Sequence, residues 1–143
     1  MKAIWFTAPN TAEVINVEKP VPEPGKVRVK LVISTISPGT ERAMLVGEQN
    51  ISLNKEKCIE VTWPRTEGYS SSGIVDAVGE GVTSLKVGDR VAMSWSKHQE
   101  YICLPESKIH KIEDDSISFE EAAMWHIGTF PIADIRKCRL ELG

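Results

Sequence analysis

The sequence has few cysteines, no excess of positive charge and no long hydrophobic run. The three cysteines are odd in number and widely spaced, which argues against a disulfide framework: Cys58, Cys103 and Cys138. A net charge of −3 gives no reason to expect nucleic acid or an anionic membrane as a partner. No apolar run approaches the roughly 20 residues of a membrane-spanning helix, and the first residues lack a signal peptide's apolar region. We therefore expect a cytoplasmic protein that binds neither nucleic acid nor membrane.

The residues that are present suit one domain with its own core. The chain has 143 residues, of which 41% are hydrophobic and 26% are charged, and it shows no internal repeat or low-complexity segment. Residues 68–91 carry apolar strand positions interrupted by five glycines: Gly68, Gly73, Gly79, Gly81 and Gly88. Glycine permits tight turns and close backbone approach, so this stretch predicts antiparallel strands that reverse near 79–81 and 88–89.

The other expected elements make a strand-rich body that ends in helices. Residues 27–33 alternate apolar and polar side chains, which predicts a long strand with one buried face. We also predict a helix capped by Ser37 or Thr40 and ended by Gly47, and a first C-terminal helix opened by Ser116 or Ser118. A second C-terminal helix is expected over 132–140. The other predicted strands are 2–7, a hairpin partner over 12–17, a paired set at 92–95 and 100–104, and 108–112.

Six segments resemble one known family in order and spacing: 1–4, 22–30, 73–82, 85–91, 100–105 and 118–123. The chain resembles the N-terminal, GroES-like domain of the medium-chain dehydrogenase/reductase superfamily. The resemblance implies a mostly β fold with short helices, a partly open β-barrel over residues 1–115. Residues 116–143 would be two junction helices leading to a Rossmann domain that is absent from this chain. The chain then looks like a fragment, and NAD or NADP would be bound mainly by the missing domain.

The same resemblance bears on zinc. Zinc-binding members place a cysteine, a His-Glu pair and a third ligand at positions that here hold Ser37, Tyr69-Ser70 and Trp125. Hydroxyl and indole groups do not replace thiolate, imidazole or carboxylate ligands, so we expect no metal and a zinc-independent protein. The alternatives are a site rebuilt from Glu41 and His126, or a zinc enzyme with substituted ligands. A zinc-less branch with similar motifs is often linked with sugar or complex-alcohol dehydrogenation.

Without zinc, alcohol or carbonyl chemistry needs another group that stabilises or protonates the reacting oxygen. Tyr69 is the donor best placed by motif, with Ser37, Thr40 and His126 behind it. The alternative for Tyr69 is a packed aromatic ring whose hydroxyl meets a backbone carbonyl.

Other polar residues near these positions have weaker assignments. Glu41 and Arg42 would bind a polar substrate, or would form a solvated pair on a helix face. Thr129 falls where relatives place a threonine beside the nicotinamide ring, or else its hydroxyl bonds its own helix. His98 and His110 are expected at the surface.

Two interpretations of function follow. The first is the substrate-side domain of an NAD(P)-dependent oxidoreductase acting on a small-molecule alcohol or carbonyl, inactive as a fragment. The alternative is a stand-alone binding or scaffold module without chemistry. The four tryptophans are expected to serve as core or interface anchors. The apolar residues of the junction helices exceed what a small barrel covers, which predicts a homodimer: Trp125, Ile127, Phe130, Ile132 and Ile135.

Overall fold

The computed structural model describes residues 1–48 and 61–139, so Cys58 lies outside the described residues. Its strands pair antiparallel in two sheets, the hairpin β1-β2 and a five-stranded sheet of order β6-β3-β4-β5-β7. The elements are β1 (Lys2–Ala8), β2 (Thr11–Asn16), β3 (Lys26–Ser34), α1 (Pro38–Val46), β4 (Ser70–Val78), β5 (Arg90–Ser94), β6 (Tyr101–Pro105), η1 (Glu106–Lys108), β7 (Ile109–Lys111), α2 (Phe119–Ala123) and α3 (Trp125–Cys138). Within the described ranges, no helix is both long and apolar enough to cross a membrane.

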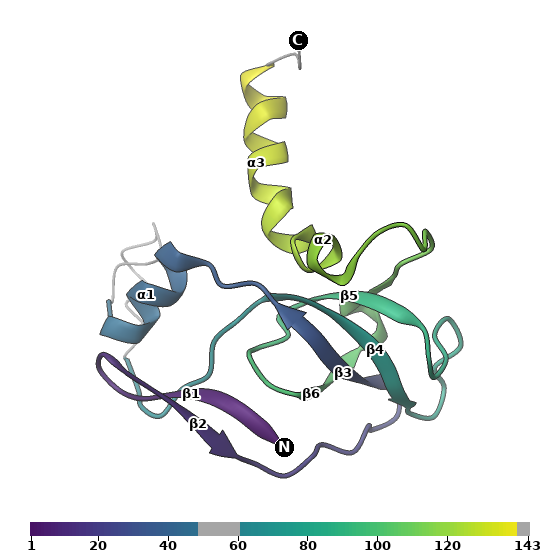
Figure 1. Ribbon diagram of the computed structural model, residues 1–143, viewed down its shortest axis with the longest axis horizontal. Helices are drawn as coiled ribbons and strands as arrows, with labels where there is room; N and C mark the ends of the chain where they lie inside the picture. The colour runs from purple at the N-terminus through teal and green to yellow at the C-terminus, as the bar shows by residue number, and fades with distance from the viewer. Residues whose placement is uncertain (49–60, 140–143) are drawn as a thin grey trace.

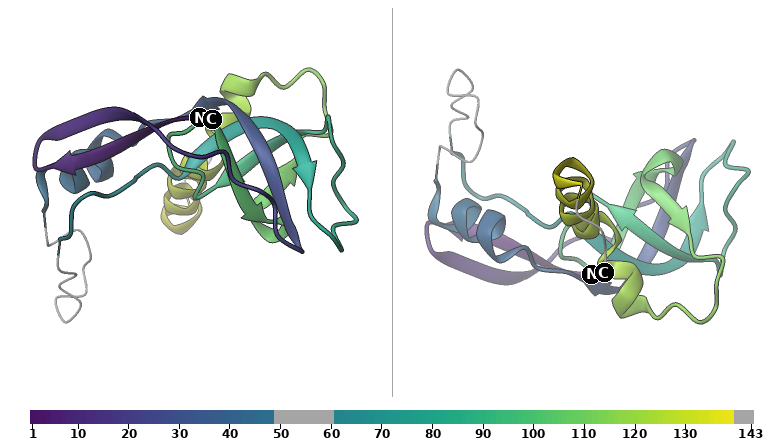
Figure 2. Two further views of the ribbon diagram at one scale, coloured as in Figure 1. Left: turned by 90° about the horizontal axis from the view of Figure 1, so that it is seen from below. Right: turned by 90° about the horizontal axis from the view of Figure 1, so that it is seen from above.

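The five-stranded sheet curls into the partly open barrel that the resemblance implied (Figure 1). Its core consists of apolar side chains from all five strands and from the β4-β5 connection: Val27, Val29, Val75, Leu85, Val91, Met93, Ile102, Leu104 and Ile109. Figure 2 shows the β1-β2 hairpin and α1 together on one side of this sheet. The mostly β fold with short helices is confirmed.

The alternating segment forms β3, as predicted. Val27 and Val29 are fully buried, whereas Val32 is 49% exposed. Leu31 packs against the core from the same face as these two valines, and Val32 points away from it, so the alternation continues although the pairing of β3 with β4 shifts between Leu31 and Ile33.

The glycine-rich stretch makes the expected reversal, because β4 and β5 pair antiparallel. The residues between them form no strand, although Leu85 from this connection fills the core. Two glycines are required by close backbone approach. A Cβ on Gly73 would lie 2.3 Å from the Lys30 carbonyl oxygen, and one on Gly79 would lie 2.0 Å from that of Glu23.

The predicted pairing of 92–95 with 100–104 was wrong. β6 pairs with β3, and β5 lies between β4 and β7. The intervening residues do not make a hairpin, because they form backbone hydrogen bonds with other segments, and Trp95 and Lys97 have positive φ values of 61° and 59°. The Lys97 N–H donates to the Gly68 carbonyl over 2.9 Å, and the His98 carbonyl accepts from the Ile4 N–H over 2.8 Å. The crossing therefore separates β5 from β6.

The first helix ends as expected and begins differently. Gly47 ends α1 with a φ of 78°, a left-handed conformation that favours glycine. Ser37 occupies the N-cap position, but its side chain makes no capping hydrogen bond. The Glu41 carboxylate accepts from the Ser37 N–H over 2.8 Å, so the first-turn acid holds the backbone of the N-cap residue.

The second C-terminal helix starts earlier than predicted. α3 begins at Trp125 and contains Pro131, whereas the sequence suggested a helix starting at 132. The proline lies in an exposed part of the helix, and the loss of its N–H is tolerated because the neighbouring turns continue. None of the α3 residues is buried, and the helix rises away from the sheet (Figure 1).

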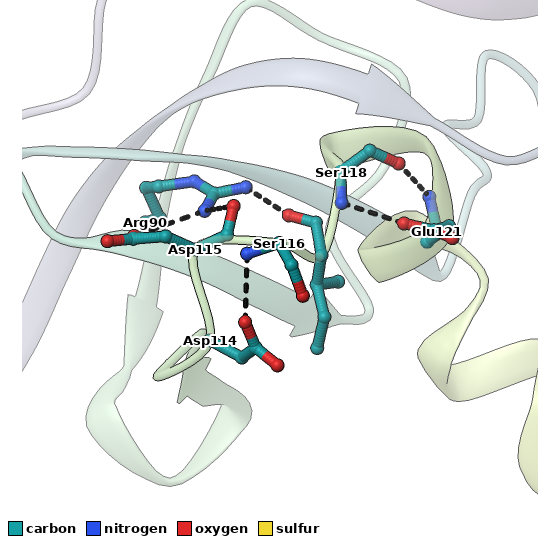
Figure 3. Close-up of polar contacts among 7 residues, drawn as sticks. Arg90, Asp114, Asp115, Ser116, Ser118 and Glu121 are labelled. Carbon is teal, nitrogen blue, oxygen red and sulfur yellow. Dashed lines mark hydrogen bonds and ion pairs between the residues drawn. The ribbon is translucent and has the colours of Figure 1, made fainter.

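A capping box starts α2 at Ser118 (Figure 3). The Ser118 hydroxyl accepts from the Glu121 N–H over 3.1 Å, and the Ser118 N–H donates to the Glu121 carboxylate over 2.8 Å. Hydrogen bonding to the Glu121 carboxylate, first from the Ser118 backbone and then from the Ser118 side chain, holds the pKa of Glu121 below its usual range. Of the two predicted caps, Ser118 is therefore the one used. Ser116 precedes the helix, and its N–H donates to Asp114 over 2.8 Å.

Ser118→Ala is expected to lower the free energy of unfolding by about 1 kcal/mol, because it leaves a first-turn N–H without its acceptor. Urea denaturation followed by circular dichroism measures the change. Ser116→Ala is the matched control and should cost less, since that hydroxyl caps no helix. Equal losses in the two variants would contradict the assignment of the cap.

Candidate functional site

Five aromatic side chains gather where the barrel meets α3, and we call them the aromatic cluster: Tyr69, Trp95, Trp125, His126 and Phe130. The Tyr69, Trp95 and His126 rings are mutual neighbours, with centroids 5.7–5.8 Å apart. Phe130 adds its ring at 5.9 Å from His126, one turn further along α3. The predicted donors Tyr69 and His126 therefore lie side by side, although 57 residues separate them in the sequence.

Two members of the cluster belong to the barrel, and the ends of two paired strands position them. Tyr69 immediately precedes β4 and Trp95 immediately follows β5. The Trp95 N–H donates to the Tyr69 carbonyl over 2.9 Å, which continues the ladder by one residue pair. Trp95 has a φ of 61° and is 57% exposed, so it is an exposed member of the cluster and not a core anchor.

Buried hydroxyl groups fix α2, and through it the start of α3, against the sheet. The Ala123 carbonyl accepts hydrogen bonds from Thr35 at 2.9 Å and from Ser70 at 2.5 Å. The Ser72 hydroxyl donates to the Phe119 carbonyl over 2.6 Å. The bonds to Ala123 satisfy a carbonyl at the end of a short helix, and together the three bonds hold His126 beside Tyr69.

The electrostatics of the cluster favour a neutral imidazole. Burial, with a smaller contribution from the Lys108 ammonium, lowers the pKa of His126. His126 is therefore uncharged at neutral pH and has one ring nitrogen that donates and one that accepts. A phenol and a neutral imidazole in contact can hold or move a proton on a bound oxygen.

A buried polar group that the sequence did not predict lies between α1, the end of β3 and the segment that crosses to β6. His98, expected at the surface, is only 8% exposed, and the carboxylate of Glu41 is close to its ring. Nε2 of His98 lies 2.7 Å from Glu41 Oε2, and Nδ1 lies 2.8 Å from Ser34 Oγ. Its local sequence gives no sign of burial, because α1 and the end of β3 provide both partners.

The other predicted residues are spread around these two groups. Glu41 is 6% exposed, so it does not form the solvated pair with Arg42, which is exposed. Thr40 is half-buried in the first turn of α1. Thr129 is exposed, and its hydroxyl donates to the His126 carbonyl over 2.6 Å. This is a hydrogen bond within its own helix, one of the two alternatives for Thr129. His110 is exposed as expected, and its ring centroid lies 4.2 Å from that of Trp125.

Residues 23–115 match the family described as the alcohol dehydrogenase GroES-like domain. The chain belongs to this family. Starvation-sensing protein RspB of Escherichia coli K12 is 36% identical over 93 residues, 65% of this chain and 24% of RspB. (R,R)-butanediol dehydrogenase of Bacillus subtilis is 28% identical over 170 residues, covering 100% of this chain and 49% of that enzyme.

Two solved structures agree with the fold. The Bacillus subtilis 2R,3R-butanediol dehydrogenase has a TM-score of 0.68 at 26% identity, covering 86% of this chain and 43% of the other. An E. coli CFT073 short chain alcohol dehydrogenase (rspB), in complex with NADH, has a TM-score of 0.71 at 27% identity, covering 87% of this chain and 41% of the other. This chain thus spans less than half the length of the relatives it matches.

The positions at which the resemblance would place zinc ligands hold no usual zinc-binding side chain. Ser37, Tyr69 and Trp125 supply hydroxyl and indole groups, which do not fit a zinc ion. In the described part of the chain, no three His, Cys, Asp or Glu side chains are grouped so as to hold a metal. Glu41, considered for a rebuilt site, contacts His98 and not His126.

Proposed function

We propose that this chain is the substrate-side domain of an NAD(P)-dependent, alcohol dehydrogenase-like oxidoreductase of the cytoplasm. Its substrate would be a small alcohol or carbonyl compound, sugar-related as in the zinc-less branch that the motifs resemble. The contact between the Tyr69 and His126 rings is the observation that carries the proposal. It puts a hydroxyl donor and a neutral imidazole side by side in the half-buried part of the aromatic cluster, with the exposed residue Thr129 on the same helix as His126.

NAD(P) would supply the hydride chemistry when it is bound. In this assignment the Tyr69 hydroxyl hydrogen-bonds the reacting oxygen, and His126 exchanges a proton with Tyr69 or with that oxygen. Ser37 and Thr40 are further donors at the N-terminal turn of α1. Arg42 is exposed and free to contact a polar substrate, whereas Glu41 acts indirectly by holding the Ser37 backbone. Thr129 would contact the nicotinamide ring.

Residues 1–143 alone are expected to bind no NAD(P) tightly and to turn over no substrate. A tight pyrophosphate site needs backbone N–H groups at a glycine-rich loop and helix N-terminus, and this sequence has no Gly-x-Gly-x-x-Gly motif. The test of the proposed function therefore uses a chain that joins residues 1–143 to a nucleotide-binding domain such as this proposal implies. Alcohol-dependent formation of reduced nicotinamide would support the proposal, and its absence over a panel of alcohols and sugar alcohols would favour a binding module.

Tyr69→Phe in that longer chain is expected to lower kcat by about 10²-fold, the lower end of what general acid–base groups contribute. The change removes the hydroxyl and keeps the ring that packs on Trp95 and His126. Tyr101→Phe is the matched control, because Tyr101 lies on β6 under the Lys19 ammonium and outside the cluster. Steady-state assays in the presence of a chelator also test zinc independence. An unchanged kcat in Tyr69→Phe would remove Tyr69 from the proton path.

Self-association through α3 is also proposed for residues 1–143. Large apolar side chains are exposed along this helix and just before it: Met124 at 47%, Trp125 at 37%, Phe130 at 55% and Ile132 at 58%. A second domain would cover this face in a longer chain, and a second copy would cover it here. Light scattering should report a dimer that Phe130→Asp converts to monomer. Val21→Asp, at a residue 78% exposed outside α3, should leave the dimer intact.

A further inference from the structure

Ser34, His98 and Glu41 form a hydrogen-bonded row, and the proposed oxidoreductase chemistry uses neither Ser34 nor His98. Its two bonds, 2.8 Å from Ser34 Oγ to His98 Nδ1 and 2.7 Å from His98 Nε2 to Glu41 Oε2, are both within the range of a functional dyad. The second oxygen of Glu41 accepts from the Ser37 N–H, so the carboxylate is fixed at both ends. The row therefore has a defined geometry.

The chemistry of the three groups determines where their protons lie. A carboxylate only accepts hydrogen bonds, so Nε2 of His98 carries a hydrogen that it donates to Glu41. In the neutral imidazole Nδ1 then has a lone pair, and the Ser34 hydroxyl must donate to it. The lone pairs of Ser34 Oγ remain available while its proton already points at a base. This is the arrangement of an activated serine, a base and an orienting acid.

Ser34 and His98 also line an open groove of about 270 Å³ between the β1-β2 hairpin and β3. Its apolar wall includes Ile4, Val14 and Val32, which are 38%, 66% and 49% exposed, and its polar wall includes Lys2, Gln99 and Glu100. A groove of this size with one apolar and one polar wall suits a short acyl chain attached to a polar carbonyl group. It is formed by other elements than those of the aromatic cluster, so it is a separate site.

We propose that Ser34 is a nucleophilic, acyl-accepting serine, with His98 as its base and Glu41 orienting the imidazole. Its substrate class is a short-chain acyl ester held in this groove. Ser34 Oγ forms a bond to the acyl carbon, and the ester bond from that carbon to its alkoxy oxygen breaks. The Ser34 proton passes to His98 Nδ1 and then to the departing alkoxide, which leaves as an alcohol. The products are acyl-Ser34 and the alcohol, with no oxidant or reductant required.

p-Nitrophenyl butyrate tests this on residues 1–143. A burst of nitrophenol stoichiometric with the protein is expected, with the butyryl group located on Ser34 by peptide mass spectrometry. Ser34→Ala should abolish the burst, and His98→Gln should slow it about 10²-fold, as expected for loss of a general base. Ser84→Ala is the matched control. Its hydroxyl is exposed and bonds the Glu106 carboxylate without an imidazole, so the burst should persist.

The experiment still tests the role of Ser34 where a variant does not fold. Circular dichroism checks each variant, and the position of the butyryl group in the unaltered chain decides the question without any substitution. Acylation at lysines, at Ser84 or at the N-terminus, or an equal burst in folded Ser34→Ala, would overturn the proposal. So would a chain that releases no nitrophenol above the buffer rate, because the row would then serve only to join α1, β3 and the crossing segment.

Discussion

Gly73→Ala is expected to destabilise the protein by about 3 kcal/mol or more, at the upper end of the cost of overpacking. Gly73 lies in β4 opposite Leu31, at the irregular pairing of β3 with β4. A Cβ there would lie 2.3 Å from the Lys30 carbonyl oxygen and 2.9 Å from a Val29 methyl group. The backbone oxygen cannot move without breaking the central strand pair, so the added methyl group forces β3 and β4 apart.

Urea denaturation at equilibrium measures this loss, and Gly39→Ala provides the control. A Cβ at Gly39 meets no atom within 4 Å, and Gly39 lies in the first turn of α1. Alanine there should change the free energy of unfolding by no more than about 1 kcal/mol, on the stabilising side, because it favours the helix. Similar losses for both substitutions would mean that glycine is not needed for close approach at Gly73.

His98→Ala is expected to lower the free energy of unfolding by about 3–5 kcal/mol, because removing one partner of a buried pair leaves the other polar group uncompensated. It leaves the Glu41 carboxylate buried at 6% exposure without its imidazole partner. It also leaves Ser34 without an acceptor for its hydroxyl. The loss should spread to three elements, since this row joins α1, the end of β3 and the segment that crosses to β6.

Two comparisons identify the cause of that loss. The double variant His98→Leu/Glu41→Met should be more stable than His98→Ala, because apolar groups in both places leave no unpaired carboxylate. Lys26→Ala breaks the exposed Lys26–Glu23 pair and should change stability little, since water screens those charges. If His98→Ala were as mild as Lys26→Ala, the row would not hold the fold together.

Local physics explains which parts of the fold follow from the sequence. The alternation over 27–33 predicts β3, since a two-residue period buries one face wherever the strand is placed. The capping box at Ser118 and the turn at Gly47 likewise depend on neighbours within a few residues. The chain reversal over 79–89 is also local, because glycine permits tight turns whatever the rest of the fold. Their positions along the chain could therefore be predicted without knowing what they pack against.

Part of the candidate site was also accessible from the sequence. Tyr69 and His126 come from the family resemblance, which also led to the expectation that the zinc ligands are missing. Residue types alone could not show that their rings meet, because that contact needs the hydroxyl bonds of Thr35, Ser70 and Ser72 to α2. The membership of Trp95 was not predicted either, because it depends on the pairing of Trp95 with Tyr69 at the end of β5.

Only the tertiary structure decided the partners of β5 and β6 and the burial of His98. The choice between a hairpin and a crossing depends on whether residues 95–100 find hydrogen bonds elsewhere, and Gly68 and Ile4 provide them. His98 meets groups 57 and 64 residues away, so the polar residues beside it in sequence carry no trace of its surroundings. The sequence by itself determined the elements whose stability is local. Long-range contacts determined the pairing of these elements and the polar groups buried between them.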